Sequence, residues 1–459
     1  MRLSRSSIRA RVKRDLPITF SQERISAHGG LELFRRFLVL RGFADRVRKA
    51  LAGTAVDGDY GVVRMVLVVV ALLLIGGARV THLAFLGVDP LVLRFCGLQR
   101  LPADRTVVRW LKAFTAPVLE RLADLIRDGV HDEIERAGLT RLTVDLDGTV
   151  LRTGAKVDGA ERGYSPHHPK DPSYYPLTAH LAQLGQILRV WNRPGNVVDS
   201  HNADGFLRVV VGELRERFGR RLIELRMDAA FFMPTVFRFL DEDRALEYAL
   251  KVPMWKWLGL RALIAERRRW TQVDRYIDGF ETRLAIPQWG RVERVVLYRK
   301  RVSHQSRKNF QLDLFDPADG HFEYSAVATN KTLSIPALWD FMAGRGAHEK
   351  TIAELKQGVA FDAIPTNDRH ANAAWQMLSV LALNLARSFQ IATGAAPRPR
   401  TWKRTYGYAF QALKTLRFEL IHQPARLVRP AGVSALRFAV SSRARQRIEA
   451  AQRHLDRAA

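Results

Sequence analysis

The sequence contains a single cysteine, Cys96, among 459 residues. One cysteine excludes an internal disulfide and a zinc site built from cysteine ligands, and it is typical of a reducing compartment, so we expect a cytoplasmic protein. Long apolar runs are also missing, because the longest, residues 65–78, has 14 residues where roughly 20 are needed to span a bilayer. This run predicts a buried helix. The basic start of the chain has no apolar segment behind it, so we expect a basic arm rather than a secretion signal.

Three common functional motifs are missing as well. The sequence has no Walker loop for nucleotide phosphates, no GxGxxG turn for a dinucleotide and no HExxH helix for zinc. Nucleotide-dependent activities and zinc proteases therefore have no support in the sequence.

The excess of basic residues is the most informative bulk property. The chain has 73 Lys and Arg residues against 46 Asp and Glu residues, which gives a formal net charge of +27, and its hydrophobic content of 47% is that of a globular protein. A surface this basic attracts polyanions, of which nucleic acid is the commonest; an acidic membrane surface is the alternative. A chain of this length is too long for one ordinary core, so we expect two to four domains.

Residues 1–138 are predicted to form a helical N-terminal domain. Their apolar residues recur at helical spacing, with breaks at several prolines and glycines. Arg105 and Arg109 fall near the start of a short helix, which fits a helix-turn-helix that contacts DNA. A plain helical bundle with solvated basic faces fits the same pattern.

The pattern changes to strands at residue 141. Predicted strands cover 141–151, 174–183 and 187–191, followed by a helix at 203–218, a strand at 221–227, a helix at 231–241 and a strand at 246–252. This order, β-β-β-α-β-α-β, is the connectivity of the RNase H-like fold, so residues 139–252 are predicted to be the first part of such an α/β core. In that fold one acid lies on the first strand and a second at or just past the end of the fourth, where Asp147 and Asp228 stand.

The first of these strands carries two acids on one face. Asp145 and Asp147 are two residues apart, so both side chains point to the same side of a strand. Two carboxylates on an apolar strand are costly to bury unless a cation lies between them, which indicates a metal or catalytic site. A solvated strand face, or a helix N-cap at Asp147, explains the same residues without such a site. Because both acids face the same way, Asp145 is a reserve candidate for the first carboxylate.

Residues 253–334 are predicted to form a β-rich insertion. The segment begins with WKWLGLRALIAERRRW and then alternates at 282–286, 294–298 and 323–329. Tryptophan beside arginine suits stacking on bases and binding of phosphate, so Trp257 and Trp289 are candidates for holding an unpaired base. Tryptophans in the core of a small β domain are the alternative.

A helical pattern returns over residues 335–395 and carries a third acid between two cations. On a helix Arg345, Glu349 and Lys356 share one face, because they stand four and then seven residues apart. Solvated helices often carry such charge pairs, so this spacing alone does not establish a site. The last region, residues 396–459, is basic and broken by prolines.

The same three residues resemble a family signature. Their spacing, R-(3)-E-(6)-K, is similar to the Y-(2)-R-(3)-E-(6)-K signature of bacterial insertion-sequence transposases of the DDE type. The resemblance covers most of the chain from about residue 20, through TVDLDGTV, GYSPHHPKDPSYYPL with RPGN, LRMDAAFF and ANAAWQMLSVLALNL. Two positions differ: Met342 replaces the signature tyrosine, and Ala229, where serine is frequent, follows the second acid. The first difference removes a phosphate-contacting hydroxyl and leaves the acids untouched.

The resemblance implies an RNase H-like catalytic core with an all-α N-terminal domain and a β-rich insertion before the last catalytic helix. It implies Asp147, Asp228 and Glu349 as catalytic residues and metal ligands, with Arg345 and Lys356 on phosphates near the cut. Such transposases hydrolyse DNA and then join the freed 3′ hydroxyl to target DNA, with two Mg²⁺ ions for which Mn²⁺ can substitute. The implied partners are double-stranded DNA, both the terminal inverted repeats of the element and the target, and a second copy of the chain. The implied location is the nucleoid.

Three other interpretations share some of these features. An RNase H-like nuclease has the same acids without strand transfer, and a DNA-binding protein descended from a transposase has lost its chemistry. A helical protein on a membrane surface requires the apolar run at residues 65–78 to be exposed.

Overall fold

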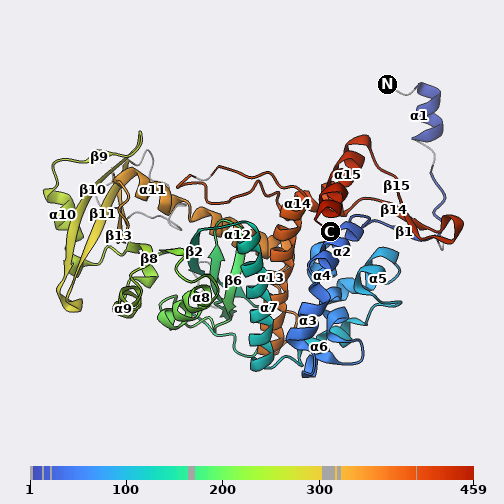
Figure 1. Cartoon of the computed structure of the whole chain (residues 1–459), viewed down its shortest axis with the longest axis horizontal. Coiled ribbons are helices and arrows are strands. Elements are labelled where there is room, and N and C mark those ends of the chain that lie inside the picture. Colours follow the sequence, from blue (N-terminus) through green and yellow to red (C-terminus); the bar gives the residue numbers. More distant parts are fainter. Residues whose placement is uncertain are drawn as a thin grey trace.

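The computed structural model describes residues 4–12, 15–20, 23–163, 171–301, 316–317, 322–399 and 401–458. Residues 164–170 of the stretch GYSPHHPKDPSYYPL therefore fall outside the described residues. The molecule is elongated, with long strands at one end, a central sheet flanked by helices, and the N-terminal helices towards the other end (Figure 1). Within the described ranges, no helix is long and apolar enough to cross a membrane.

The first 138 residues form mainly helices, as expected. They are α1 (Arg5–Arg11), α2 (Leu31–Leu40), α3 (Phe43–Leu51), α4 (Val62–Leu74), α5 (Pro90–Cys96), α6 (Asp104–Leu111), α7 (Ala116–Arg136) and the 3-10 helices η1 (Ala55–Asp57) and η2 (Val80–Phe85). The apolar run forms α4, and most of its residues are buried. This helix ends earlier than the run does, because Gly76 has φ = 95°, outside the helical region.

The N-terminal helices share a core with a helix from late in the chain. That helix, α13 (Arg369–Ala392), contacts α4, α6 and α7 on one side and strand β6 on another. The rings of Phe34 and Phe389 lie 4.6 Å apart between centroids. Because helices and a strand surround it, α13 is buried along most of its length. The N-terminal helices are thereby packed directly on the helix that covers the sheet.

The central sheet has both antiparallel and parallel pairs. Its elements are β2 (Arg141–Gly148), β5 (Leu177–Leu181), β6 (Gln186–Trp191), α8 (Ala203–Phe218), β7 (Leu222–Met227), α9 (Pro234–Glu242) and β8 (Leu246–Val252), with a separate short pair β3 (Leu151–Arg152) and β4 (Ser173–Tyr174). The strands lie in the order β6-β5-β2-β7-β8; the first two pairings are antiparallel and the last two parallel. The predicted element order is therefore present, and α8 has the predicted bounds.

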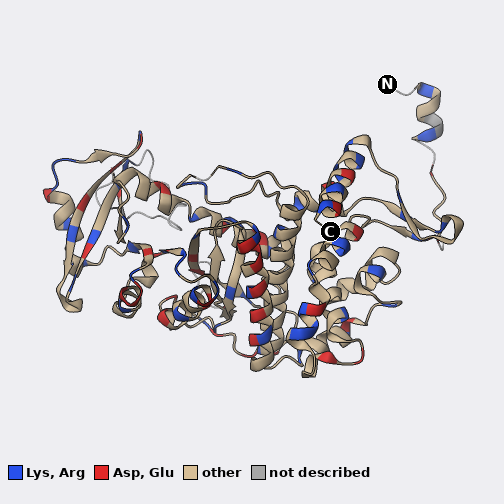
Figure 2. Cartoon of the chain, in the orientation of Figure 1, with Lys and Arg blue, Asp and Glu red and all other residues tan. Residues whose placement is uncertain are grey.

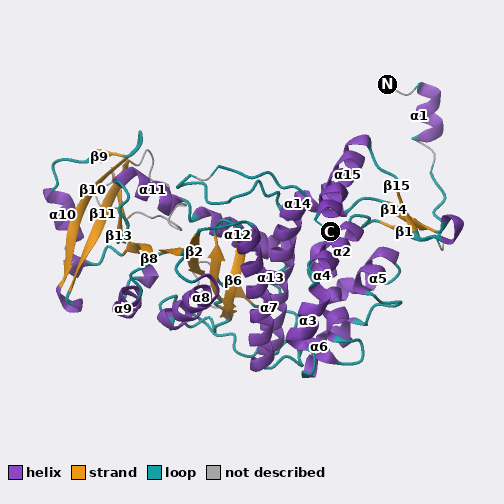
Figure 3. Ribbon diagram, in the orientation of Figure 1, coloured by secondary structure: helices purple, strands orange, loops and turns teal. Residues whose placement is uncertain are grey.

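The β-rich segment continues this sheet. Its elements are η4 (Lys256–Leu258), α10 (Leu260–Glu266), β9 (Thr271–Gln272), β10 (Ile277–Ile286), η5 (Pro287–Trp289), β11 (Arg291–Arg301), β12 (Asp316–Pro317) and β13 (Phe322–Thr329). Strand β13 pairs antiparallel with β8, which makes one ten-stranded sheet. The strands are longer than the predicted stretches, because the β10–β11 hairpin keeps its pairing up to the turn. Figure 3 shows these strands projecting from the helical part of the molecule.

Two helices follow the sheet and lead back to its centre. They are α11 (Ile335–Ala343) and α12 (Gly346–Val359), which carries the third predicted acid. Met342, which stands at the position of the signature tyrosine, is buried on α11 in a cluster with Leu338 and Phe341. An apolar side chain suits this buried position, where a tyrosine hydroxyl would need a hydrogen-bond partner.

The basic C-terminal region has regular structure. It contains α14 (Leu413–Leu416), the π-helical turn η6 (Arg417–Ile421), β14 (Ala425–Val428), η7 (Pro430–Gly432), β15 (Ala435–Phe438) and α15 (Ser442–Arg457). The sequence predicts an entirely helical N-terminal region. The short strand β1 (Ile25–Ser26) of this region nevertheless pairs with β14. Two residues are too short a run for an alternating pattern to show in the sequence. Figure 2 shows basic residues in all parts of the molecule, including α15.

Candidate active site

The two predicted strand-end acids lie on neighbouring parallel strands. Strand β2 pairs with β7 with Asp145 opposite Arg226. Asp147 is two residues further along β2, and Asp228 directly follows the last residue of β7. Because the carboxyl ends of neighbouring parallel strands meet at one edge of a sheet, this pairing brings the two acids together. Asp228 also caps η3 (Ala229–Phe231), since its carboxylate accepts a hydrogen bond from the Ala230 amide at 2.9 Å.

A third carboxylate, that of Asp199, completes an acidic cluster. Carboxylate oxygens of Asp147, Asp199 and Asp228 all lie within 4.8 Å of one another. Asp199 comes from the loop between β6 and α8 and is 7% exposed, whereas the other two acids are half-buried. Asp199 is not among the residues that the sequence predicts, because an irregular loop has no periodicity that indicates where a side chain points. The only signal was its position three residues after the end of the RPGN motif.

Arg345 contacts the first acid of this cluster. Its NH2 group lies 2.9 Å from Oδ2 of Asp147 and donates to the carbonyl oxygen of Leu146 at 3.0 Å. Arg345 precedes α12, and 14% of its side chain is exposed. The resemblance implies a DNA phosphate as the partner of this residue; within the chain its partners are a carboxylate and the backbone of β2.

The electrostatics of the cluster show an excess of negative charge. Burial raises the pKa of Asp147 to about 7; Arg345 lowers this pKa, and the charges of Asp228, Asp199 and Glu349 raise it. Burial also raises the pKa of Asp199 above its usual range. One bound guanidinium therefore does not compensate the acids around it, and a further cation would stabilise their ionised forms.

Glu349 lies beside the cluster but is not one of its three members. It stands on the first turn of α12, four residues after Arg345, and its side chain is exposed. Its negative charge contributes to the raised pKa of Asp147, so the two carboxylates are electrostatically coupled. The structure thus brings two of the three predicted acids together and places the third on the adjacent helix.

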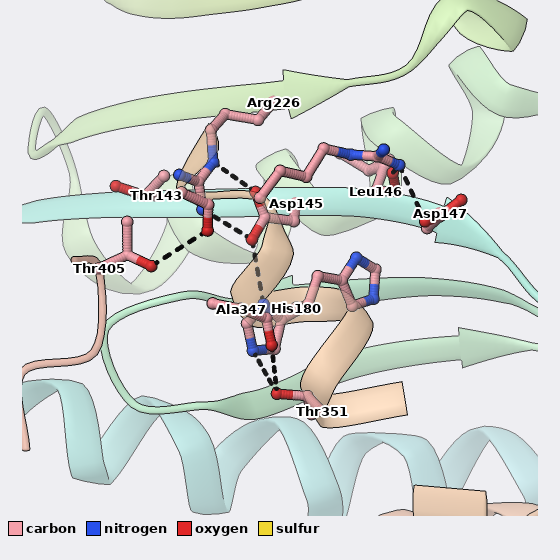
Figure 4. Close-up of polar contacts among 12 residues, drawn as sticks. Thr143, Asp145, Leu146, Asp147, His180, Arg226, Ala347, Thr351 and Thr405 are labelled. Carbon is pink, nitrogen blue, oxygen red and sulfur yellow. Dashed lines mark hydrogen bonds and ion pairs between the residues drawn. The ribbon is translucent and has the colours of Figure 1, made fainter. Parts of the chain in front are cut away.

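Asp145, the reserve candidate, is part of a buried ion pair. Its two oxygens lie 2.5 Å from Nε and 2.8 Å from NH2 of Arg226, and Nδ1 of His180 lies 3.1 Å from Oδ2 (Figure 4). The side chains of Asp145 and Arg226 have no exposed surface. Although burial acts to raise the pKa of Asp145, the charge of Arg226 holds it well below its usual range. Its carboxylate is thus satisfied by protein groups, which does not favour the reserve role.

Polar contacts of His180 and Thr178, which both lie on β5, attach α12 to the sheet. Thr351 Oγ1 lies 3.1 Å from Nε2 of His180 and 2.8 Å from the hydroxyl of Tyr406. The ring of His348 stacks on that of His180 with 4.9 Å between centroids, and its Nε2 lies 3.0 Å from Oγ1 of Thr178. These contacts fix the rotation of α12 about its axis, and with it the positions of the residues that its first turn presents to the acids.

The remaining basic residues predicted to contact DNA lie in two regions. Lys356 is half-buried on α12, and its Nζ donates to the carbonyl oxygen of Val150 at 3.1 Å; burial lowers its pKa. Arg105 and Arg109 are exposed one turn apart on α6. Lys356 is therefore next to the chain that follows the first acid, whereas the two arginines belong to the N-terminal helices.

The tryptophans form a cluster next to the second acid. The rings of Trp255 and Trp257 stack 5.5 Å apart and each residue is 43% exposed. Trp289 is half-buried, and its ring centroid lies 5.9 Å from that of Trp257 and 4.9 Å from that of Phe232. Phe232 follows Asp228 by four residues. Trp289 thus has the surroundings of a core residue, whereas Trp257 presents part of its ring to solvent.

The residues present fit a divalent cation. All three clustered groups are carboxylates, and hard oxygen ligands of this kind are those that Mg²⁺ and Mn²⁺ take. Oδ1 of Asp199 is buried and accepts no hydrogen bond from any residue that the structure describes. A buried carboxylate oxygen without a donor is costly unless a cation or a solvent molecule satisfies it.

Comparisons with known proteins identify the family of the chain. The model of the family described as transposase DDE domain group 1 matches residues 9–459. The chain is similar in structure to a piggyBac transposase solved as a synaptic complex with hairpin DNA, with a TM-score of 0.44 and 12% sequence identity over 93% of this chain and 84% of that chain. No curated protein matches the sequence. Because the family match spans nearly the whole chain, the protein belongs to the transposase DDE domain family, group 1.

Proposed function

We propose that this protein binds the ends of its own insertion sequence, cleaves the DNA by metal-dependent phosphoryl transfer and joins the 3′ ends to target DNA. One observation carries the proposal: in a chain of the DDE transposase family, Asp147 and Asp228 meet at the ends of neighbouring parallel strands with their oxygens within 4.8 Å. Phosphoryl transfer by metal ions needs a cluster of hard oxygen ligands and little other covalent chemistry from the protein.

The proposed core has the RNase H-like fold. The strand order β6-β5-β2-β7-β8, with β2, β7 and β8 parallel, supports this assignment. The domain boundaries at about residues 138, 252, 334 and 395 are proposed with it. The N-terminal helices and the core share packing through α13, so the first boundary separates functions rather than independent cores.

Asp147, Asp228 and Glu349 are the proposed catalytic ligands. Two divalent ions, Mg²⁺ or Mn²⁺, would activate the attacking oxygen and stabilise the leaving oxygen when bound. Asp147 and Asp228 are held by rigid strand ends, whereas Glu349 projects from a helix. Arg345 holds Asp147 in place through the 2.9 Å contact between its NH2 group and Oδ2 of that carboxylate.

The cations near the acids are proposed to bind the phosphates that flank the cut. Arg345 lies beside Asp147 with 14% of its side chain exposed, and we assign it to a phosphate oxygen next to the cut. Lys356 is on the same helix beside Val150. Arg345 then contacts β2 and the DNA, and Lys356 contacts the residues that follow β2 and the DNA.

Further DNA contacts are proposed for the N-terminal helices, away from the cut, and for the tryptophan cluster, near the cut. Arg105 and Arg109 are exposed on one face of α6 and suit phosphate contacts. Trp257 offers an exposed ring for an unpaired base, and the ring of Trp289 packs edge to face against it. Two element ends must be brought together, so we propose a dimer on DNA, with the protein located at the nucleoid.

The test is a reaction on a supercoiled plasmid that carries the gene's own flanking DNA, with Mg²⁺. The wild type is expected to cut at short inverted repeats and to yield joined DNA, whereas Asp147→Asn, Asp228→Asn and Glu349→Gln lose cleavage and keep end binding within a few fold. Asp204→Asn is the control, because it removes one acidic charge on α8 outside the cluster. Cuts without joined products would indicate a nuclease, and DNA binding without cuts would indicate a transposase-derived binding protein.

A further inference from the structure

The carboxylate of Asp199 is unusual for a loop residue because it is buried beside two other acids. It is 7% exposed and lies in the segment between β6 and α8. Its Oδ2 accepts a hydrogen bond of 2.7 Å from the hydroxyl of Tyr175, whereas Oδ1 accepts none among the described residues. Burial of a carboxylate next to other carboxylates is unfavourable unless the charge has a counterpart.

Arg193 does not supply that counterpart by direct hydrogen bonding. Its NH2 group lies 3.5 Å from Oδ1 of Asp199 as an ion pair, and this group has no hydrogen-bond acceptor in the part of the chain that is described. The rest of the guanidinium binds backbone: NH1 donates to the carbonyl oxygens of Val198, Asp199 and His201 at 3.0–3.4 Å, and Nε donates to that of Tyr175 at 3.1 Å. Arg193 therefore fixes the loop more than it neutralises the acid.

The loop places Asp199 against the end of β2. A Cβ added to Gly148, the residue after Asp147, would overlap Oδ1 of Asp199 and the ring of Tyr175. The absence of a side chain at position 148 is thus what allows the two acids to approach. The loop, Arg193 and Gly148 together fix the position of the Asp199 carboxylate.

We propose that Asp199 is a direct ligand of the divalent metal ion held by Asp147 and Asp228, and that the three carboxylates bind one ion before DNA arrives. Tyr175 and Arg193 are positioning residues in this arrangement, because they hold the loop and one oxygen and leave Oδ1 for the ion. Glu349, which lies outside the three-carboxylate group, then belongs to the set that acts when DNA is bound. This inference rests on the proposed function of the same site.

The test is Mn²⁺ binding to the full-length protein without DNA, followed by the electron paramagnetic resonance signal of free Mn²⁺. Asp199→Asn keeps an oxygen that accepts the Tyr175 hydrogen bond, so it removes the charge with little change in packing. We expect it to weaken Mn²⁺ binding at least tenfold and to reduce the rise in melting temperature that saturating Mn²⁺ produces. Asp204→Asn, which removes an acid five residues away on α8, is expected to bind Mn²⁺ like the wild type.

Tyr175→Phe gives a second measurement that does not depend on Asp199→Asn folding. It keeps every carboxylate and removes one hydrogen bond, and loss of such a support typically weakens metal binding about tenfold or more. Wild-type Mn²⁺ affinity in Asp199→Asn, or in Tyr175→Phe where the first variant does not fold, would overturn the inference.

A third variant separates this inference from the proposed function. Asp228→Asn is expected to lose Mn²⁺ binding in the same assay. If Asp228→Asn loses binding while Asp199→Asn keeps it, only the role of Asp199 is wrong. If neither substitution changes binding, the metal site itself is wrong and the proposed function fails with it.

Discussion

Oδ1 of Asp199 occupies the space in which a side chain at Gly148 would begin. Gly148→Ala is therefore expected to push the Asp199 loop away from Asp147 and to reduce end cleavage at least tenfold. Overpacking of this kind typically costs about 1–3 kcal/mol of stability. Gly154→Ala is the control, because a Cβ there meets no atom within 4 Å. Cleavage by Gly148→Ala at the rate of the control would contradict the close approach.

The buried pair of Asp145 and Arg226 is expected to act on stability. Asp145→Asn leaves a guanidinium without its counter-ion, and breaking a buried pair by removing one partner typically costs about 3–5 kcal/mol. Urea unfolding measures this loss, with Asp204→Asn as the control that stays within about 0.5 kcal/mol of the wild type. Unchanged stability together with lost metal binding would instead make Asp145 the first carboxylate.

The two tryptophans are expected to separate into a packing role and a binding role. Trp289→Ala removes a ring packed on Phe232 and should lower stability by about 3–5 kcal/mol. Trp257 is 43% exposed, so Trp257→Ala should change stability less and lower the yield of cleaved or hairpin ends instead. Denaturation and product gels of both variants provide the measurement. Unchanged yields of cleaved and hairpin ends in Trp257→Ala would show that this residue has only a packing role.

Stability is expected to fall below neutral pH through His131. Burial lowers the pKa of this histidine to about 4 from an ordinary value near 6.5. The unfolded chain therefore binds a proton that the folded chain does not, so the contribution is complete above pH 6.5 and is lost as the pH falls towards 4. The slope from this one group is about 1.4 kcal/mol per pH unit.

His131→Gln tests this pH dependence against His370→Gln, which changes an exposed histidine. Urea unfolding at pH 7.5, 6 and 5 is expected to give a shallower loss of stability in His131→Gln than in the wild type, and the wild-type loss in His370→Gln. Equal slopes in all three proteins would show that folding does not lower the pKa of His131.

How far the sequence predicts the site depends on the element that carries each residue. Asp147 and Asp228 were placed correctly at strand ends because alternation along β2 and β7 is strong and both strands are followed by turns. Asp199 was missed because its place depends on the contacts of Arg193 with a loop backbone, which leave no periodic signal. Asp145 and Asp147 have the same direction in the sequence pattern, and only the pairing of Asp145 with Arg226 distinguishes them.

The fold shows the same division. Helix α8 and strand β8 have the predicted bounds, since their hydrophobic spacing is regular. The continuation of the sheet through β13, the pairing of β1 with β14 and the packing of α13 on the N-terminal helices all join segments far apart in the chain. Such contacts depend on tertiary structure, which the local periodicity of a sequence does not indicate.

The most direct test of the central claim exchanges one ligand and then the metal. Asp228→Cys replaces a hard carboxylate with a softer thiolate, which binds Mn²⁺ better than Mg²⁺. Cleavage of the element ends by this variant is expected to be lost in Mg²⁺ and partly restored in Mn²⁺, while the wild type cleaves in both. Cleavage by Asp228→Cys in Mg²⁺ at the wild-type rate would contradict the claim that Asp228 holds a catalytic metal ion.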